Sequence, residues 1–252
     1  MSTRALLPAS LKAEVVHNLR DTEQSWAFVG SAPSLGGVFF GKCLIHLPDP
    51  EFTEKGLPME IQVLLKLRNN ASFPKLRAYA LHRTGYFMAT DLLLPEPLPL
   101  SAKRLFFPLV SAVVDLHRAG FMSRDIKLSN LLWTPGLTVC DFDLAHPLPL
   151  ASGVVGSDGF MAPEILAGGQ YNEKVDIYAA GVCLLALELG LSELEVAYHL
   201  GTREQKVRAL GSIEPGLALA LAPMLSADPE KRPSAAACLL SAQLVITARW
   251  LG

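Results

Sequence analysis

The pattern of apolar residues changes character at a proline-rich stretch around residues 91–100. Before it, short aromatic and β-branched runs at 26–29 and 38–45 flank a Pro/Gly turn, which predicts a β-hairpin. After it, long and almost wholly apolar segments at 105–118 and 175–189 predict buried helices. A strand-rich part followed by a helix-rich part favours an α+β fold of two lobes, with a small β-rich N-lobe, a larger helical C-lobe and a cleft between them.

Further elements fit the same division of the chain. Pro58 precedes a segment at 59–67 whose apolar residues recur at helical spacing, and proline near a first turn is typical of a helix start. Residues 76–82 and 86–92 are predicted to form two more strands. In the second part, helices are predicted at 217–225 and 235–251.

Composition excludes several classes of function. The chain has 252 residues, of which 50% are hydrophobic and 18% charged, so it can bury a large core. Its formal net charge of −2 shows no polybasic character, and neither nucleic acid nor a membrane is an expected partner. Residues 1–16 lack the continuous apolar stretch of a signal peptide, and no run reaches the roughly 18 apolar residues that a membrane-spanning helix needs.

The four cysteines are widely scattered along the chain, at Cys43, Cys140, Cys183 and Cys238. They form neither a C-x-x-C pattern nor a cluster with histidine, so zinc binding is not indicated. Reduced thiols in a buried setting are the simplest interpretation, Cys140 included. We therefore expect a cytoplasmic or nuclear protein.

The motif richest in chemistry lies in the second part of the chain. Residues 123–130 read Ser-Arg-Asp-Ile-Lys-Leu-Ser-Asn, and Asp-Phe-Asp follows at 141–143. Together they offer a carboxylate to accept a proton from an attacking hydroxyl, oxygen ligands to hold Mg²⁺ against a triphosphate, and a cation for the moving phosphoryl group. The carboxylate is that of Asp125, the oxygen ligands are those of Asn130 and Asp141, and the cation is Lys127. The spacing predicts a phosphoryl-transfer site.

This stretch resembles the catalytic loop H-R-D-x-K-x-x-N and the metal-binding D-F-G of eukaryotic protein kinases. More positions match that family in order along the chain. They are Lys42 for the lysine of V-A-I-K, Glu60 for the glutamate that holds it, Glu164 in an intact A-P-E, Asp176 for the buried aspartate that anchors the catalytic loop, and Arg232 for the arginine that pairs with Glu164. The resemblance implies a single kinase domain over residues 1–252, with an N-lobe at about 10–90, a hinge at about 90–95 and a C-lobe at about 96–252.

The resemblance also implies an activity, namely an ATP-dependent serine/threonine protein kinase that transfers the γ-phosphate to a hydroxyl of a protein substrate. Asp125 would be the catalytic base, with Lys127 beside it as in the serine/threonine branch. Mg²⁺, with Mn²⁺ as a substitute, would bind Asn130 and Asp141. The nucleotide would contact both of these ligands, the pair Lys42 and Glu60, and the hinge residues Asp91 and Leu93. The sequence predicts nothing about the oligomeric state.

The glycine-rich loop of the family is missing. If Lys42 is the phosphate-pairing lysine, this loop falls at residues 20–27, which contain no glycine and carry Asp21 and Glu23. A backbone without glycine approaches phosphate less closely, and the two carboxylates would repel a triphosphate that they faced.

An alternative alignment places the loop at residues 31–38 and gains Gly36. That alignment leaves too short a stretch between Val38 and Glu60 for a further strand, its turn and the start of a helix. We favour the first alignment, in which Gly36 and Gly37 belong to a turn between two strands.

Three single residues also depart from the family pattern. Phe40 stands where the family usually has alanine against the adenine ring, so it could fill the nucleotide pocket. Ser123 replaces a histidine that buttresses the catalytic loop. Asp143 replaces the glycine that permits a backbone bend after Phe142; aspartate can adopt the left-handed conformation there at some cost.

These departures keep alternatives open. A pseudokinase, acting as a regulatory or scaffold partner, is the second hypothesis, because the glycine-rich loop is degenerate. A kinase of small molecules is a weaker third, since the A-P-E segment that shapes a peptide-binding surface is present. The short length and the drifted motifs suggest a viral source, and then a host-cell location.

Two serines between Asp141 and Glu164 invite opposite interpretations. Ser152 lies where relatives are often phosphorylated, and Arg124 could receive such a phosphate, although an unmodified serine is the simpler interpretation. Ser157 is expected to support Asp125 and Lys127 rather than to act as a switch.

Overall fold

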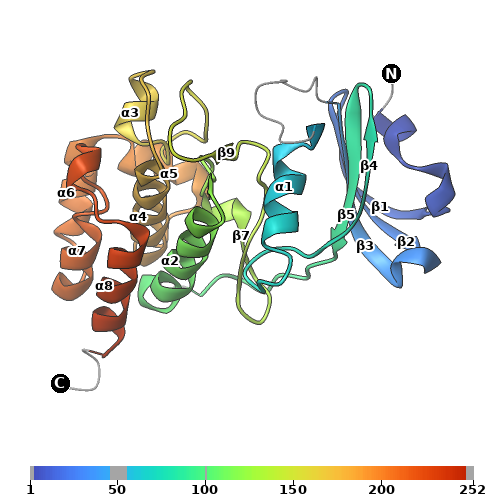
Figure 1. Ribbon diagram of the computed structural model, residues 1–252. Coiled ribbons are helices and arrows are strands. Elements are labelled where there is room, and N and C mark those ends of the chain that lie inside the picture. Colours follow the sequence, from blue (N-terminus) through green and yellow to red (C-terminus); the bar gives the residue numbers. More distant parts are fainter. Residues whose placement is uncertain (1–2, 46–55, 100, 248–252) are drawn as a thin grey trace. The chain divides into compact units, whose positions relative to one another are not determined.

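A computed structural model describes residues 3–45, 56–99 and 101–247. The chain divides into two compact units, Met1–Leu94 and Pro95–Gly252 (Figure 1). In its described residues the first unit holds a five-stranded sheet and one α-helix, and the second unit is mainly helical. The predicted order, strands first and helices second, is therefore confirmed.

The sheet of the N-terminal unit has the order β1-β2-β3-β5-β4, and its neighbouring strands are antiparallel. Its strands are β1 (Glu14–Asp21), β2 (Ser25–Ala32), β3 (Gly37–Ile45), β4 (Leu76–His82) and β5 (Gly85–Asp91). The predicted hairpin is β2–β3, in which Ala27 pairs with Lys42. Sequence analysis missed β1, because this edge strand is exposed along its whole length and lacks the alternation of a half-buried strand.

The two faces of this sheet are covered by different segments. Helix α1 (Met59–Lys66) begins after Pro58, as predicted, and lies on one face. The N-terminal 3₁₀ turn η1 (Thr3–Leu6) lies on the other, where it joins an aromatic core (Figure 1). The buried members of this core are Leu6, Trp26, Phe28, Ala32, Phe39, Cys43, Phe87 and Ala89.

Two strand glycines make room for this aromatic core. A Cβ atom at Gly41 would collide with the ring of Phe28, and one at Gly30 would collide with the ring of Phe39. The rings of Phe28 and Phe39 meet edge to face, with centroids 6.0 Å apart. Gly41 directly precedes Lys42, so the packing of Phe28 fixes the strand that carries this lysine.

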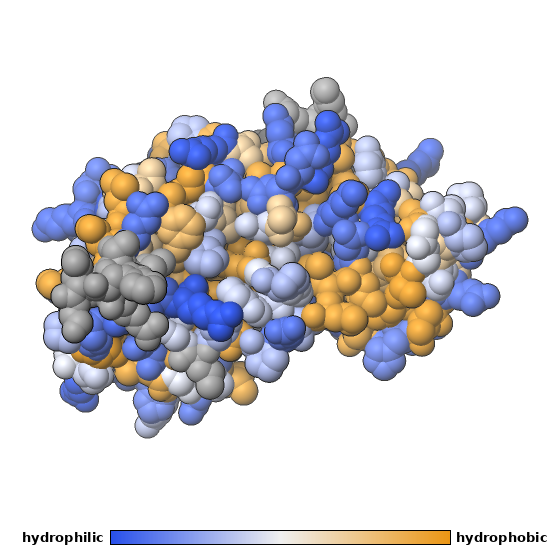
Figure 2. Space-filling model, turned by 90° about the horizontal axis from the view of Figure 1, so that it is seen from below, coloured by the Kyte–Doolittle hydropathy of each residue, from blue (hydrophilic) through white to orange (hydrophobic). Residues whose placement is uncertain are grey.

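Figure 2 shows a broad apolar area on the N-terminal unit, at the right of the view. Six exposed large apolar side chains of this unit lie on strands β1, β3 and β4. They are Val15, Val16, Leu19, Val38, Tyr79 and Leu81.

The C-terminal unit is built around helix α4 (Lys174–Glu188), whose side chains from Val175 to Leu187 are all buried. Helix α2 (Ala102–Arg118) packs on α4 and on α8 (Ala235–Thr247). The other helices are α3 (Pro163–Leu166), α5 (Glu193–Leu200), α6 (Arg203–Leu210) and α7 (Pro215–Leu221). The predicted helices at 105–118, 175–189, 217–225 and 235–251 correspond to α2, α4, α7 and α8, and residues 248–251 lie outside the described part.

Two short strand pairs frame the loops of this unit. Strands β6 (Phe121–Met122) and β9 (His146–Pro147) form one pair, and β7 (Leu131–Trp133) and β8 (Leu137–Val139) form the other. The loop between β6 and β7 therefore carries the Asp-x-Lys-x-x-Asn motif, and Asp141–Asp143 follows β8.

Among the described residues, no single helix is both long enough and apolar enough to cross a membrane. Helices α4 and α5 reach that length and composition only when taken together, and they are bent by 102° relative to each other.

Candidate functional site

Lys42 and Glu60 form a buried ion pair within the N-terminal unit. The Nζ atom of Lys42 lies 2.9 Å from Oε2 of Glu60, and the side chains are 11% and 4% exposed. The hydroxyl of Tyr86, on the neighbouring strand β5, donates to the same oxygen at 3.3 Å. The structure thus brings together the lysine predicted to pair with nucleotide phosphates and the glutamate predicted to hold that lysine. It also adds Tyr86, which sequence analysis missed.

The connection between β1 and β2 settles the choice between the two loop alignments. This connection consists of Thr22–Gln24. Lys42 lies on β3, the strand that follows β1 and β2, as the favoured alignment requires. Gly37 begins β3 and Gly36 ends the 3₁₀ turn η3 (Pro33–Leu35), so both belong to the turn between β2 and β3. The favoured alignment is confirmed.

The β1–β2 turn is closed by its own hydrogen bonds. The backbone N–H of Thr22 donates to the carbonyl of Ser25 at 2.9 Å, and the N–H of Ser25 donates to the Thr22 hydroxyl at 3.0 Å. Glu23 is exposed at the tip of this turn. Two amide groups that a glycine-rich loop could offer to a phosphate are therefore already engaged.

Phe40 shares a face of β3 with Lys42, because side chains two apart along a strand point the same way. It is half-buried, whereas Phe39 and Cys43 belong to the aromatic core on the other face. Phe40 therefore lies on the side of β3 that carries Lys42, which is the side where a nucleotide would lie. This position is consistent with the concern that Phe40 fills the nucleotide pocket.

The two predicted hinge residues lie at the end of the sheet. Asp91 is the last residue of β5, where it pairs with Phe39 in register and forms an ion pair with Arg77. The hydroxyl of Thr90 donates to the Asp91 carbonyl at 3.2 Å. Leu93 follows the strand and is half-buried. Asp91 is thus in the same sheet as Lys42, and Leu93 lies just beyond it.

Asp125 is the centre of a polar cluster in the C-terminal unit. Its Oδ1 accepts from the Ser157 hydroxyl at 2.7 Å, and its Oδ2 lies 3.0 Å from Nζ of Lys127. Nζ of Lys127 also donates to the Ser157 hydroxyl at 2.8 Å. The support that Ser157 was predicted to give to Asp125 and Lys127 is confirmed, and it fixes the orientation of a carboxylate that is only 9% exposed.

Asn130 is tied to the same aspartate through its side-chain amide. Its Nδ2 donates to the Asp125 carbonyl at 3.0 Å and approaches Oδ2 of Asp125 at 3.3 Å. With the nitrogen engaged in this way, the carbonyl oxygen Oδ1 is the end of Asn130 suited to a metal ion. The backbone N–H of Cys140 donates to the Asn130 carbonyl at 3.0 Å, which brings Asp141, the next residue, to the same loop cluster.

The backbone strain in this region is not where the sequence led us to expect it. Asp143 does not take the left-handed conformation; Asp141 does, with φ of 64°, and so does Arg124, with φ of 65°. The bend thus precedes the fully buried Phe142 rather than following it. The substitution of glycine by aspartate at 143 consequently imposes no left-handed strain, and the predicted cost there is wrong.

Asp176 anchors the catalytic loop from helix α4. This fully buried carboxylate accepts from the backbone N–H groups of Ser123 at 2.8 Å and Arg124 at 2.9 Å. Nε2 of His117, on α2, lies 2.9 Å from Oδ2 of Asp176. The predicted anchoring role is confirmed. Sequence analysis missed His117, because its side chain meets Asp176 only once α2 and α4 pack together.

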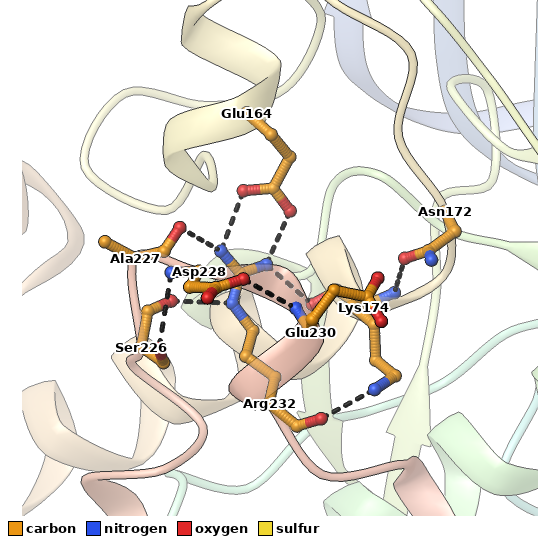
Figure 3. A network of polar contacts seen from close by, with 8 residues as sticks. All are labelled: Glu164, Asn172, Lys174, Ser226, Ala227, Asp228, Glu230 and Arg232. Carbon is orange, nitrogen blue, oxygen red and sulfur yellow. Dashed lines mark hydrogen bonds and ion pairs between the residues drawn. The ribbon is translucent and has the colours of Figure 1, made fainter.

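Glu164 and Arg232 form the long-range ion pair that the sequence predicts (Figure 3). Their two guanidinium–carboxylate bonds measure 2.5 and 2.7 Å, and the Arg232 side chain is fully buried. Arg232 also donates to the carbonyls of Ser226 and Lys174. This bidentate pair connects the A-P-E segment to the residues that precede α8.

Three of the four cysteines lie in the interior of the described part of the structure. Cys43, Cys183 and Cys238 are buried, and burial raises the pKa of Cys43 and Cys238 to about 12. Cys140 is half-buried, which is more exposed than expected, and its Sγ lies 3.4 Å from the Asn130 carbonyl.

Comparison with known proteins places these observations in a family. The protein kinase domain model matches residues 90–243. The hormonally up-regulated neu tumor-associated kinase of Mus musculus is 32% identical over 166 residues, which cover 60% of this chain and 22% of that protein. The serine/threonine-protein kinase Nek9 of Mus musculus is 33% identical over 146 residues, 53% of this chain and 15% of that protein. The matches thus span about a fifth, or less, of the length of these relatives.

A solved structure supports the fold over the whole chain. The Cydia pomonella granulovirus kinase PK-1 matches with a TM-score of 0.70 and 20% sequence identity, covering 96% of this chain and 97% of that one. The predicted α+β, protein-kinase-like fold, with a sheet-based N-lobe and a helical C-lobe, is confirmed. With the family model matching well over half of its length and the buried pairs of the family's pattern in place, the chain belongs to the protein kinase family.

Proposed function

We propose that this chain is an ATP-dependent protein kinase that phosphorylates serine or threonine hydroxyls of a protein substrate. The observation that carries the proposal is the cluster around Asp125, in which Lys127, Asn130 and Ser157 all contact this carboxylate. Phosphoryl transfer needs positioning and charge neutralisation more than covalent chemistry, and this cluster supplies both.

Each residue has a distinct role in the proposed mechanism. Asp125 orients the substrate hydroxyl and accepts its proton, while Lys127 neutralises charge on the phosphoryl group in transfer. Ser157 holds these two side chains in register. Lys42, held by its hydrogen bond to Glu60, pairs with the nucleotide phosphates.

The oxygen atoms on Asn130 and Asp141 suit a hard divalent cation. A carboxylate and an amide carbonyl are ligands that Mg²⁺ and Mn²⁺ accept, and the Asn130 amide nitrogen is turned towards Asp125. When bound there, Mg²⁺ would screen the negative charge of the triphosphate. Asn130 and Asp141 would hold the ion, and Asp141 would do so from a backbone in the left-handed region.

A pseudokinase is the second candidate function, and one observation favours it. The β1–β2 turn has no glycine, engages its own amides and presents Glu23 at its tip. Such a turn has fewer amide groups to offer a triphosphate than a glycine-rich loop, and its exposed carboxylate disfavours one nearby. In this function the kinase fold would bind a protein partner without transferring phosphate.

Phosphate transfer to peptides distinguishes the two functions. The wild type is incubated with γ-labelled Mg·ATP and peptides that offer serine, threonine or tyrosine, and the labelled amino acid is identified. We expect label on serine and threonine, lost at least a hundredfold in Asp125→Asn and retained in Glu204→Gln, an exposed change on α6. Label on tyrosine would contradict the substrate class. Transfer that survives Asp125→Asn would contradict the role of the base, and no transfer by the wild type would favour the pseudokinase.

The cytoplasmic or nuclear location and the viral source stay predictions from the sequence.

A further inference from the structure

Arg124, which follows Ser123 in the catalytic loop, has its guanidinium group already engaged by oxygen atoms. Its Nε donates to the Leu144 carbonyl at 2.7 Å. Its Nη1 donates to the Ser152 carbonyl at 3.3 Å and to the Tyr171 hydroxyl at 3.1 Å. These are the kinds of contact that a phosphate on the activation segment, residues 141–164, would otherwise provide.

Tyr171 binds the activation segment through both its backbone and its side chain. Its backbone N–H donates to the Ala151 carbonyl at 3.0 Å, and the Ala151 N–H donates to the Tyr171 carbonyl at 2.9 Å. Its hydroxyl is shared between the carbonyls of Ser152, at 3.1 Å, and Gly153, at 3.0 Å. Tyr171 is 3% exposed, so these bonds form where water competes little.

The phenol and the guanidinium therefore converge on one short piece of the segment. Arg124 also donates its backbone N–H to Asp176 of α4, and Tyr171 lies three residues before that helix begins. The pKa of His146 on β9 is lowered mainly by burial of this histidine, and the positive charge of Arg124 lowers it to a smaller extent. Catalytic loop, activation segment and the start of α4 are thus joined at Tyr171.

We propose that Tyr171 is a positioning residue that holds the activation segment on Arg124 in place of a phosphate on Ser152. The Ser152 side chain is exposed, and the hydrogen bonds at this position use its backbone carbonyl. The segment is then ordered in the unmodified protein. The inference rests on the proposed kinase activity for its functional consequence, but not for the order of the segment.

Amide hydrogen exchange at residues 148–156 tests the order of the segment without requiring activity. The wild type is compared before and after phosphatase treatment, and with Ser152→Ala and Tyr171→Phe. We expect equal protection in the first three forms. Tyr171→Phe keeps the ring and loses the hydroxyl, so exchange should become about tenfold faster while the unfolding midpoint changes little.

A charge at position 152 provides the reciprocal test. Ser152→Glu added to Tyr171→Phe places a carboxylate beside Arg124, and we expect it to restore protection and most of an approximately tenfold loss in kcat/KM. The same Ser152→Glu change in the wild type should alter neither quantity by more than about twofold. Rescue of this kind is not expected if Tyr171 only fills space.

Three results would overturn the inference. The first is loss of protection on phosphatase treatment of the wild type, an arm that needs no substitution. The second is unchanged protection in Tyr171→Phe, and the third is failure of Ser152→Glu to restore it. If no form transfers phosphate while the exchange results appear as expected, the proposed kinase activity fails and the role of Tyr171 stands.

Discussion

The hydroxyl of Ser157 donates to Oδ1 of Asp125 at 2.7 Å, across 32 positions of sequence. The same hydroxyl accepts from Nζ of Lys127 at 2.8 Å, so one small side chain orders a carboxylate and an ammonium group at once. It does so from the activation segment, which makes the orientation of Asp125 depend on the position of that segment. The order of residues 141–164 and the chemistry at Asp125 are therefore coupled.

Removing this hydroxyl should lower turnover without unfolding the protein. We expect Ser157→Ala to reduce kcat for peptide phosphorylation about tenfold, because Asp125 and Lys127 lose their shared partner. Ser157→Thr keeps a hydroxyl and should retain most of the activity, and Ser212→Ala, on an exposed serine far along the chain, serves as the control. Equal rates for Ser157→Ala and the wild type would show that the hydrogen bonds to Ser157 do not position Asp125.

The pair Lys42–Glu60 should show strong coupling in a double-mutant cycle. Each charge is buried, so Lys42→Met or Glu60→Gln alone removes the opposite charge from its partner, and we expect a loss of about 3–5 kcal/mol in the free energy of unfolding. The loss in the double variant should be about 1–3 kcal/mol smaller than the sum of the losses in the two single variants. Urea unfolding measures all three, with Lys66→Met on the exposed face of α1 as the control. Strict additivity would mean that the ion pair contributes nothing to the fold.

Arg232 should be a major contributor to the stability of the C-terminal unit. Its guanidinium is fully buried and bidentate on Glu164, so Arg232→Met leaves a carboxylate without its partner and should cost about 3–5 kcal/mol. Lys231→Met changes the neighbouring side chain, which is 77% exposed, and should cost less than about 0.5 kcal/mol. Denaturant unfolding of the two variants gives the comparison. A loss for Arg232→Met as small as that for Lys231→Met would refute the assignment.

Lys206 should make stability depend on alkaline pH. This residue is 5% exposed, and burial lowers its pKa to about 8 although its Nζ donates to the Leu200 carbonyl and lies 5.5 Å from the centre of the Tyr178 ring. Between about pH 8 and the ordinary lysine value of 10.5, the unfolded chain binds more protons than the folded one. The free energy of unfolding should therefore gain a contribution that rises with pH across this window, by about 2–3 kcal/mol.

The test for Lys206 is a difference between two proteins, because other lysines, tyrosines and cysteines titrate in the same range. Urea unfolding of the wild type and of Lys206→Met is followed from pH 7 to pH 10.5. The free energy of unfolding of the wild type should start below that of the variant, and the difference should shrink as pH rises. Parallel curves would show that the ammonium group is as well stabilised inside the protein as in water.

Much of this structure could be predicted because its signals are local. Apolar runs and Pro/Gly turns gave the β2–β3 hairpin, α1, α2 and α4, and ordered motif positions gave the contacts of Glu164 with Arg232 and of Asp176 with the catalytic loop. Helices α5 and α6 were missed, although the capping boxes that start with Ser192 and Thr202 mark both in the sequence. They are short and mostly exposed, so periodicity alone is a weak signal for them.

The rest depends on contacts that no local pattern encodes. His117, Tyr86 and Tyr171 meet their partners only after distant elements pack together. Strain was expected at Asp143 from a glycine position, yet the left-handed backbone is at Asp141, because the conformation of one residue is set by its neighbours as well as by its side chain. The glycine-free turn at Thr22–Gln24, in contrast, was visible in the sequence, and the structure shows how its amides are engaged.

Binding of Mg·ATP to the unmodified protein tests the central claim most directly, because the polar cluster at Asp125 can act only if a nucleotide is held without a glycine-rich loop. Thermal unfolding is measured with ATP and Mg²⁺, with ATP and EDTA, and with Lys42→Met in place of the wild type. At a concentration 100 times its dissociation constant, the nucleotide should add about 2.7 kcal/mol to the free energy of unfolding of the wild type. The increase should need the metal and be reduced in Lys42→Met. No change with ATP under either Mg²⁺ or Mn²⁺ would contradict the account.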